Sequence, residues 1–242
     1  MLFENINEKK IILDSKRPFP INTVKSLRES LLVEWTYNSN AIEGNTLTMS
    51  ETKVVLEGIT VGGKTLREHL EVINHREAIL YVEDIITKDE EFSEWQIKNI
   101  HRLVLKGIDD DNAGAYRKEN VTISGAKHIP PQSINLQSEV DAFIKWYIEE
   151  SIRLHPIEKA SLVHSIFVKI HPFIDGNGRT ARLLLNLELM KSGFPPIIIK
   201  KEKRSEYYDA LDKSHTSGDY SDFVQIVADE VNEMMDFYLK LI

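Results

Sequence analysis

The chain has 242 residues, enough for one sizeable globular domain or for a core domain with a smaller extension. Hydrophobic residues make up 42% and charged residues 28%, so the chain is expected to fold around a buried core. The formal net charge of −8 argues against a nucleic-acid surface, which needs concentrated basic charge. No cysteine is present, which excludes disulfides and thiolate metal sites.

The N-terminal residues lack the apolar stretch of a signal peptide. No apolar run approaches the ~20 residues that a membrane-spanning helix needs. We therefore expect a cytoplasmic protein that binds neither a membrane nor nucleic acid.

Apolar residues follow helical spacing through most of the chain, which predicts an all-α fold. Residues 1–60 are expected to form an N-terminal helical extension, with a flexible joint at Gly62-Gly63-Lys64 before a main body over residues 61–242. Capping boxes are predicted at Thr48–Glu51 and at Ser93–Gln96. In chain order, helices are predicted over a segment ending at Glu43, over 48–58 and 66–85, from Ser93 to near Gly107, and over 142–148, 158–170, 179–190, 205–213 and 221–241.

One segment departs from helical spacing. Residues 121–129 alternate around Ser124-Gly125 and are followed by Pro130-Pro131, which is typical of a short β-hairpin. A plain surface loop is the other interpretation, and the residues alone leave both open. A lone hairpin is marginally stable, so its presence in an α-helical protein would indicate a docking role.

The segment Asp175-Gly176-Asn177-Gly178 predicts a binding site for an anion. Its glycines permit positive φ angles, and a helix is predicted directly after it. Backbone N–H groups would then converge at the positive end of that helix.

The following helix is apolar nearly all round, yet Arg179, Arg182 and Asn186 fall on one of its faces. Arginines are rarely buried without a partner. A structural ion pair with an internal carboxylate is one interpretation. Because the anion loop lies just upstream, we favour a pair of guanidiniums that clamps phosphate oxygens, with Asn186 beside them.

His171 and Asp175, which both precede the glycines, have side chains suited to catalysis and to metal binding. His171 is placed to take a proton from a nucleophile beside a bound phosphate, as a general base does. Asp175, next to an anion site, is expected to hold Mg²⁺ together with phosphate oxygens. Together these residues indicate phosphoryl or nucleotidyl transfer.

The segment from His171 to Arg182 matches the HPFx[DE]GNGRxxR signature of Fic-domain proteins at every fixed position. The chain therefore resembles this family. The resemblance implies an α-helical Fic bundle with a short β-hairpin flap. It also implies transfer of AMP from ATP to a Ser, Thr or Tyr hydroxyl of a target protein, with pyrophosphate leaving.

By this resemblance His171 deprotonates the target hydroxyl, Asp175 binds Mg²⁺ and Arg182 reaches the γ-phosphate. The residues implied to cradle the phosphates are Gly176, Asn177, Gly178 and Arg179, and those implied near the base or ribose are Tyr207 and Tyr208. The residues implied to align the target by strand addition are Thr122, Ile123, Ser124, Gly125, Ala126, Lys127, His128 and Ile129.

The segment Ser39–Asn45 resembles the [ST]xxxE[GA]N inhibitory motif of the autoinhibited subclass, so Ser39, Glu43 and Asn45 are expected to be inhibitory. Glu43 closes a predicted helix at its negative end and therefore needs a cation. Arg182 needs an anion when ATP is absent. A Glu43–Arg182 pair would meet both needs and block the γ-phosphate, and breaking such a buried pair costs ~3–5 kcal/mol.

Residues 37–222 also resemble the core of the animal endoplasmic-reticulum member of the family, including Gly114-Ala115-Tyr116-Arg117 and Ile129-Pro130-Pro131. Relatives form homodimers through the segment around Leu66, so a homodimer is expected. In that subclass the inhibitory glutamate also positions water for removing AMP, which makes a de-AMPylase the alternative reaction. A nucleotide-sensing binding module without turnover is the alternative from another class.

Overall fold

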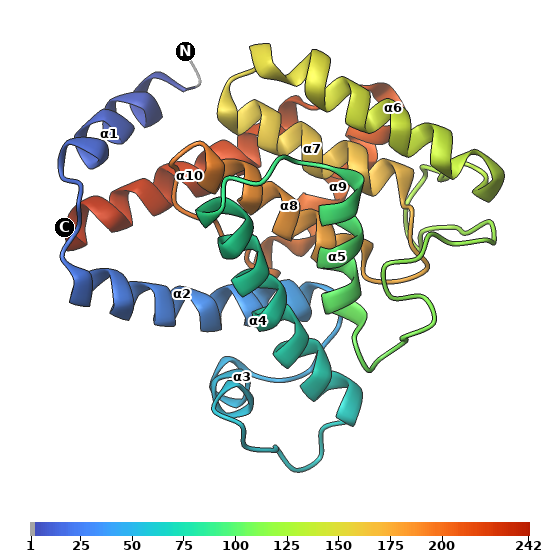
Figure 1. Ribbon diagram of the computed structural model, residues 1–242, viewed down its shortest axis with the longest axis horizontal. Coiled ribbons are helices and arrows are strands. Elements are labelled where there is room, and N and C mark those ends of the chain that lie inside the picture. The colour runs from blue at the N-terminus through green and yellow to red at the C-terminus, as the bar shows by residue number, and fades with distance from the viewer. Residues whose placement is uncertain (1–2) are drawn as a thin grey trace.

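The computed structural model describes residues 3–242, and these residues form helices and loops without a strand (Figure 1). The all-α class predicted from the sequence is confirmed. The α-helices are α1 (Glu4–Ser15), α2 (Ile21–Ile42), α3 (Met49–Leu56), α4 (Leu66–Thr87), α5 (Glu94–Leu105), α6 (Leu136–Glu149), α7 (Pro156–Ile170), α8 (Asn177–Lys191), α9 (Arg204–Ser217) and α10 (Ser221–Leu241). Short 3-10 turns lie at Ser133–Asn135, Ser151–Arg153 and Lys201–Lys203.

Helix α8 lies near the centre of the molecule and packs against α2, α4, α5 and α7 (Figure 1). Its apolar side chains point in every direction and are fully buried, including Leu183, Leu184 and Leu187. A helix that is apolar all round is stable only when neighbours cover every face. The loop between α7 and α8 is therefore held at both ends by the core.

The N-terminal helices share this core. Leu27, Leu31 and Trp35 of α2 pack in the same apolar cluster as residues of α4, α5, α7 and α8. Helix α1 packs against α10. Residues on both sides of the division expected at residue 60 therefore share one apolar cluster, and the division itself stays a prediction. At the expected flexible joint, Lys64 Nζ donates to the Thr46 carbonyl at 2.6 Å and ties the α3–α4 loop to the turn after α2.

Helix starts follow the predicted capping chemistry in part. Thr48 and Glu51 form the expected capping box at α3. The box expected at Ser93 is wrong, because the Ser93 hydroxyl contacts the Gln96 side chain instead of a backbone N–H, although α5 does begin there. A box that was not predicted opens α4, where Thr65 accepts from Glu68 N at 3.2 Å.

The hairpin expected over residues 121–129 is also wrong, since this segment is a loop with a single turn between Ile123 and Ala126. Its N–H groups find partners outside the segment. Lys127 N and His128 N both donate to Asp212 Oδ1 of α9, at 2.8 and 3.0 Å. A carboxylate that takes two neighbouring N–H groups removes donors that a two-stranded ladder would need.

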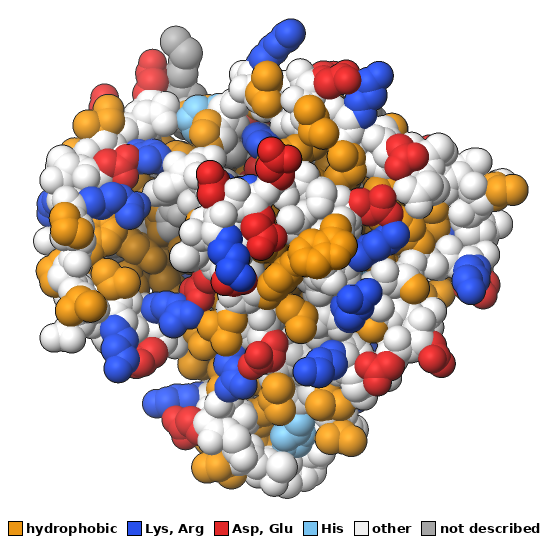
Figure 2. Space-filling model, in the orientation of Figure 1, with side chains coloured by type: hydrophobic (Ala, Val, Ile, Leu, Met, Phe, Trp, Pro, Cys, Tyr) orange, Lys and Arg blue, Asp and Glu red, His pale blue; other side chains and the backbone are white. Residues whose placement is uncertain are grey.

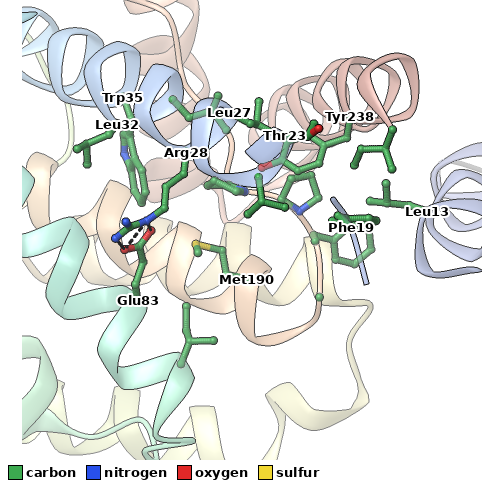
Figure 3. A pocket seen from close by; sticks show the side chains of 18 of the residues that line it. Leu13, Phe19, Thr23, Leu27, Arg28, Leu32, Trp35, Glu83, Met190 and Tyr238 are labelled. Carbon is green, nitrogen blue, oxygen red and sulfur yellow. Dashed lines mark hydrogen bonds and ion pairs between the residues drawn. The ribbon is translucent and has the colours of Figure 1, made fainter. Parts of the chain in front are cut away.

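A mostly apolar cavity of about 300 Å³ lies beside the first half of α2, where it faces α8 and α10. Figure 3 shows Arg28 of α2 joined to Glu83 of α4 at this cavity, with Leu27 and Trp35 on its wall. None of the residues for which the sequence predicts chemistry lines the cavity. The candidate site lies instead at the other end of α2.

Within the described part of the chain, no helix is both long and apolar enough to cross a membrane. On the face shown in Figure 2, Lys and Arg side chains are interspersed with Asp and Glu rather than gathered into one basic patch. That mixture is unlike the concentrated positive surface that nucleic acid requires.

The capping box at α4 yields a stability prediction. Thr65→Ala removes the hydroxyl that accepts the Glu68 N–H, so we expect the free energy of unfolding to fall by ~1 kcal/mol. Urea denaturation measures this change. Thr60→Ala, in the exposed loop just before α4, is the matched control. Equal unfolding free energies for the two variants would contradict the assignment.

Candidate active site

The site begins where α7 ends, at His171. This residue has φ 50° and ψ 58°, a left-handed conformation that costs a non-glycine residue ~1–3 kcal/mol. The carbonyl groups on either side of the bend are held from outside the loop. Arg117 Nε donates to the His171 carbonyl at 2.9 Å, and Arg117 N donates to the Pro172 carbonyl at 2.9 Å.

Asn177 fixes the next part of the loop. Its amide oxygen accepts from Phe173 N at 3.0 Å, and its amide nitrogen donates to the Phe173 carbonyl at 2.8 Å. The side chain is buried, and both of its polar atoms are engaged in this exchange. Asn177 therefore offers only its backbone N–H to a ligand, together with the N–H groups of Gly178 and Arg179 in the first turn of α8, where a helix supplies no carbonyl partner.

His101 of α5 packs against the same loop and bonds to it. Its ring stacks on Phe173 with centroids 3.5 Å apart and planes 3° apart. Its Nδ1 accepts from Gly114 N at 2.9 Å, so its Nε2 must carry the proton that is donated to the Asp175 carbonyl at 2.9 Å. Gly176, with φ 76°, lies directly against this ring, and a Cβ there would crowd it at 3.3 Å.

Two arginines of α8 lie at this end of the helix, and both are at most 3% exposed. Arg179 has carboxylates near it, Glu71 at 3.4 Å and Asp175 at 3.5 Å, but its Nε and Nη1 make no hydrogen bond. A buried guanidinium with unmet donors is costly. Arg179 is therefore suited to an anion that binds at the start of α8.

Arg182, one turn further along, is fully engaged by α2 and α9. Its Nη2 lies 2.7 Å from Glu43 Oε1 and donates to the Ser39 carbonyl at 2.8 Å. Its Nε donates to the Ser39 hydroxyl at 3.0 Å, and Nη1 donates to Tyr207 at 3.3 Å. Burial alone would lower the pKa of Arg182, but Glu43 and Tyr207 raise it above the ordinary value.

Glu43 lies over the start of α8. It is the C-cap of α2, and a Cβ atom at Gly178 would collide with its carboxylate. The carboxylate therefore occupies the space that a phosphate would take against the glycine. Asn45 fixes the turn that follows, since its amide donates to the Glu68 carbonyl at 3.1 Å and to Glu71 Oε2 at 2.9 Å.

Asp175 faces the same space. Burial would raise its pKa, but Arg179, the Gly176 N–H and Arg67 together lower the pKa below its ordinary value, so it is ionised at neutral pH. Arg67 Nη2 of α4 lies 2.5 Å from Asp175 Oδ2. No cluster of three or more metal-ligating side chains exists within residues 3–242. A half-exposed, ionised carboxylate suits Mg²⁺ only where phosphate oxygens and water complete the shell.

Three residues expected to touch a nucleotide have other partners. Asn186 is buried, donates to the Ile197 carbonyl at 2.9 Å and accepts from Ile197 N at 2.8 Å, so in this structure it holds the chain after α8. Tyr207 is 1% exposed and supports Arg182 through its hydroxyl, which also contacts His164 at 2.9 Å. Tyr208 is partly exposed and donates weakly to the Ile42 carbonyl at 3.4 Å.

The sequence interpretation did not include Arg67, Glu71, His101 or Arg117. These residues come from α4, α5 and the loop after it, and reach the site over 54 to 108 residues of chain. A signal was available for His101, which lies on the apolar face of α5 with Ile97 and Val104. Arg117 belonged to the Gly114–Arg117 segment already noted for its resemblance.

Burial gives two histidines of the site a testable property. It lowers the pKa of His101 and of His171 to about 4. We expect NMR titration, assigned with His101→Gln and His171→Gln, to give midpoints near 4 rather than the usual ~6.5. Because the unfolded chain binds these protons already near pH 6.5, stability should fall as the pH drops from ~6.5 toward 4. A midpoint near 6.5 at either ring would contradict the buried site.

Comparison of the sequence with known proteins identifies relatives of this chain. Residues 91–189 match the model of the Fic/DOC family. The protein adenylyltransferase Fic of Nematostella vectensis is 40% identical over 98% of this chain, and the match covers 56% of that protein. The enzyme of the same name from Drosophila virilis is 36% identical over 98% of this chain and 50% of its own length. The chain thus spans about half the length of the curated relatives it matches.

Comparison with solved structures leads to the same family. Fic-1 from C. elegans superposes with a TM-score of 0.87 at 33% identity, covering 99% of this chain and 72% of that one. A Fic-domain signalling protein from Bacteroides thetaiotaomicron superposes with a TM-score of 0.90 at 28% identity, covering 98% and 97%. The chain belongs to the Fic/DOC family.

Proposed function

We propose that this protein is an adenylyltransferase that moves AMP from ATP to a hydroxyl side chain of a target protein, and that Glu43 holds it in an inhibited state. The observation that carries this proposal is the pair of buried guanidiniums on α8, Arg179 and Arg182, at the end of the helix that follows the glycine loop. There Arg179 Nε and Nη1 make no hydrogen bond. The names of the two curated relatives, both protein adenylyltransferases, support the same chemistry.

In the proposed reaction the triphosphate lies over the first turn of α8. Its oxygens accept from the N–H groups of Gly178 and Arg179, and Arg182 holds the γ-phosphate. His171, neutral at pH 7, takes the proton of the target hydroxyl while that oxygen bonds to the α-phosphorus. The bond from the α-phosphorus to the bridging oxygen breaks, and pyrophosphate leaves.

Asp175 is the residue that would hold Mg²⁺, and its low pKa keeps it ionised for that purpose. Bound Mg²⁺ would neutralise charge on the phosphates. Arg67 now pairs with Asp175 and with Glu71 and is largely exposed, so its guanidinium can leave Asp175 while it keeps the bond to Glu71.

Inhibition is proposed to follow from competition for Arg182. Glu43 and a γ-phosphate need the same guanidinium and the same space beside Gly178. The two anions would repel each other if both were present. Release therefore requires the end of α2 to move or Glu43 to rotate away.

Two further features belong to the proposal. Residues 122–129 are proposed to dock the target backbone even though they form a loop, and Ile129 is 73% exposed there. A homodimer is proposed through the start of α4, where Leu66 is 74% exposed. Sedimentation of wild-type protein and Leu66→Asp tests the dimer.

Labelling with α-³²P-ATP and Mg²⁺ tests the enzyme and its inhibition together. We expect Glu43→Gly to self-label at least ~10-fold faster than wild type, since it leaves the buried Arg182 without its anion and open to the γ-phosphate. Adding His171→Ala should lower the rate by ~10²-fold or more, the usual loss of a general base. Glu57→Gly is the matched control, because Glu57 is likewise a helix C-cap followed by glycine but is exposed.

The inhibitory role fails if Glu43→Gly labels no faster than wild type and Glu57→Gly. The transferase proposal fails if no variant with His171 intact forms a covalent AMP product.

Removal of AMP is a second candidate for the same site. It is favoured by the position of Glu43, whose side chain is 33% exposed and so is reached by water beside the proposed phosphate position. Wild-type protein should then release AMP from a protein previously labelled by the Glu43→Gly variant, and Glu43→Gln should not. Retention of all label by wild type would remove this candidate.

A further inference from the structure

Arg117 is a buried arginine outside the loop-and-helix segment. It is 3% exposed and forms no ion pair within residues 3–242. Its guanidinium donates instead to backbone carbonyls. Nε donates to His171 at 2.9 Å, Nη1 to Glu119 at 2.8 Å and Nη2 to Pro131 at 2.6 Å.

These acceptors lie at positions that matter for the site. Glu119 and Pro131 stand at the two ends of the loop that contains residues 122–129, so Arg117 closes this loop at its base. The third acceptor is the carbonyl of His171, whose left-handed backbone needs support. One side chain therefore joins both ends of the loop to the residue proposed as the base.

The loop has few other attachments. Besides Arg117, its two ends are joined by Ser133 N, which donates to Asn120 Oδ1 at 2.8 Å. Its second half is held by Asp212 and by His128, whose Nε2 contacts the Lys169 carbonyl at 2.9 Å. Because no strand ladder stiffens it, the distance between the docked target and His171 depends on the base of the loop. Only a guanidinium supplies several donors in a fixed planar fork.

We propose that Arg117 is a positioning residue that holds the target-docking loop and His171 in one fixed geometry. This inference rests on the proposed function for its effect on catalysis. Its effect on the loop stands apart from that function. Arg117 contacts none of the proposed nucleotide-binding groups, so nucleotide affinity should not depend on it.

The experiment uses the full chain with Glu43→Gly as parent, and adds Arg117→Lys or Arg117→Gln. We expect the self-labelling rate to fall at least ~10-fold in Arg117→Gln, because a 1 Å misplacement near the reacting atoms is enough for that. Arg117→Lys keeps a single donor nitrogen, so its self-labelling rate should lie between those of the parent and of Arg117→Gln. The affinity for ATP, measured by calorimetry, should stay within ~2-fold of the parent, since each tenfold change needs 1.4 kcal/mol of lost contact.

Limited trypsin digestion measures the local opening of the loop and does not require enzyme activity. Cleavage after Lys118 and Lys127 should be faster in Arg117→Gln than in the parent, as seen by mass spectrometry. Arg153→Gln, on an exposed arginine after α6, is the control and should change neither labelling nor cleavage.

The possible results distinguish a positioning role of Arg117 from a general structural role and from failure of the transferase proposal. Unchanged labelling and unchanged cleavage in both Arg117 variants would overturn the inference. A parallel loss of labelling, ATP affinity and thermal stability would also overturn it, because it would indicate a general structural role. If the parent itself does not label, the transferase proposal fails. Faster cleavage of Arg117→Gln would then still support the inference that Arg117 holds the base of the loop.

Discussion

A buried positive charge, Arg182, is the constraint on which the site depends. Apolar side chains of α8 bring the helix into the centre of the fold and carry this guanidinium out of water. A charge in that position requires an anion. In this structure Glu43 of α2 supplies it at 2.7 Å, with Ser39 and Tyr207 satisfying the remaining donors. The end of α2 is therefore tied to the proposed phosphate position through the Glu43 side chain.

The rest of the site surrounds that pair. His101 and Arg117 hold the carbonyls of the α7–α8 loop, so that the backbone can bend sharply at His171 and at Gly176. Asn177 closes the loop on itself. The result is a rigid anion site with ionised Asp175 on one side and Glu43 over Gly178. Under the proposed function, this arrangement is an active site whose binding groups are in place and whose phosphate position is taken by Glu43.

The sequence predicted the parts of the site that are local in the chain. The glycine loop, the buried α8 and the C-terminal position of Glu43 follow from spacing and capping rules. Spacing places Asn186 on the face of the arginines but does not foresee its bonds to the Ile197 backbone. The hairpin pattern failed for residues 122–129, because Asp212 of α9 accepts the N–H groups of Lys127 and His128. The partners of Arg67, His101 and Arg117 lie 54 to 108 residues away in the chain, and a local pattern does not identify partners at that separation, even where it marks a residue such as His101 as buried.

The central claim is that Glu43 and the γ-phosphate exclude each other at Arg182. Calorimetric titration of Mg²⁺–ATP into wild type, Glu43→Gln and the control Glu57→Gln tests it most directly, without requiring turnover or a known target. Glu43→Gln keeps the shape of the side chain and removes its charge. The account predicts that this variant binds ATP at least ~10-fold more tightly than the other two, which corresponds to ~1.4 kcal/mol. Equal affinities in all three proteins would contradict it.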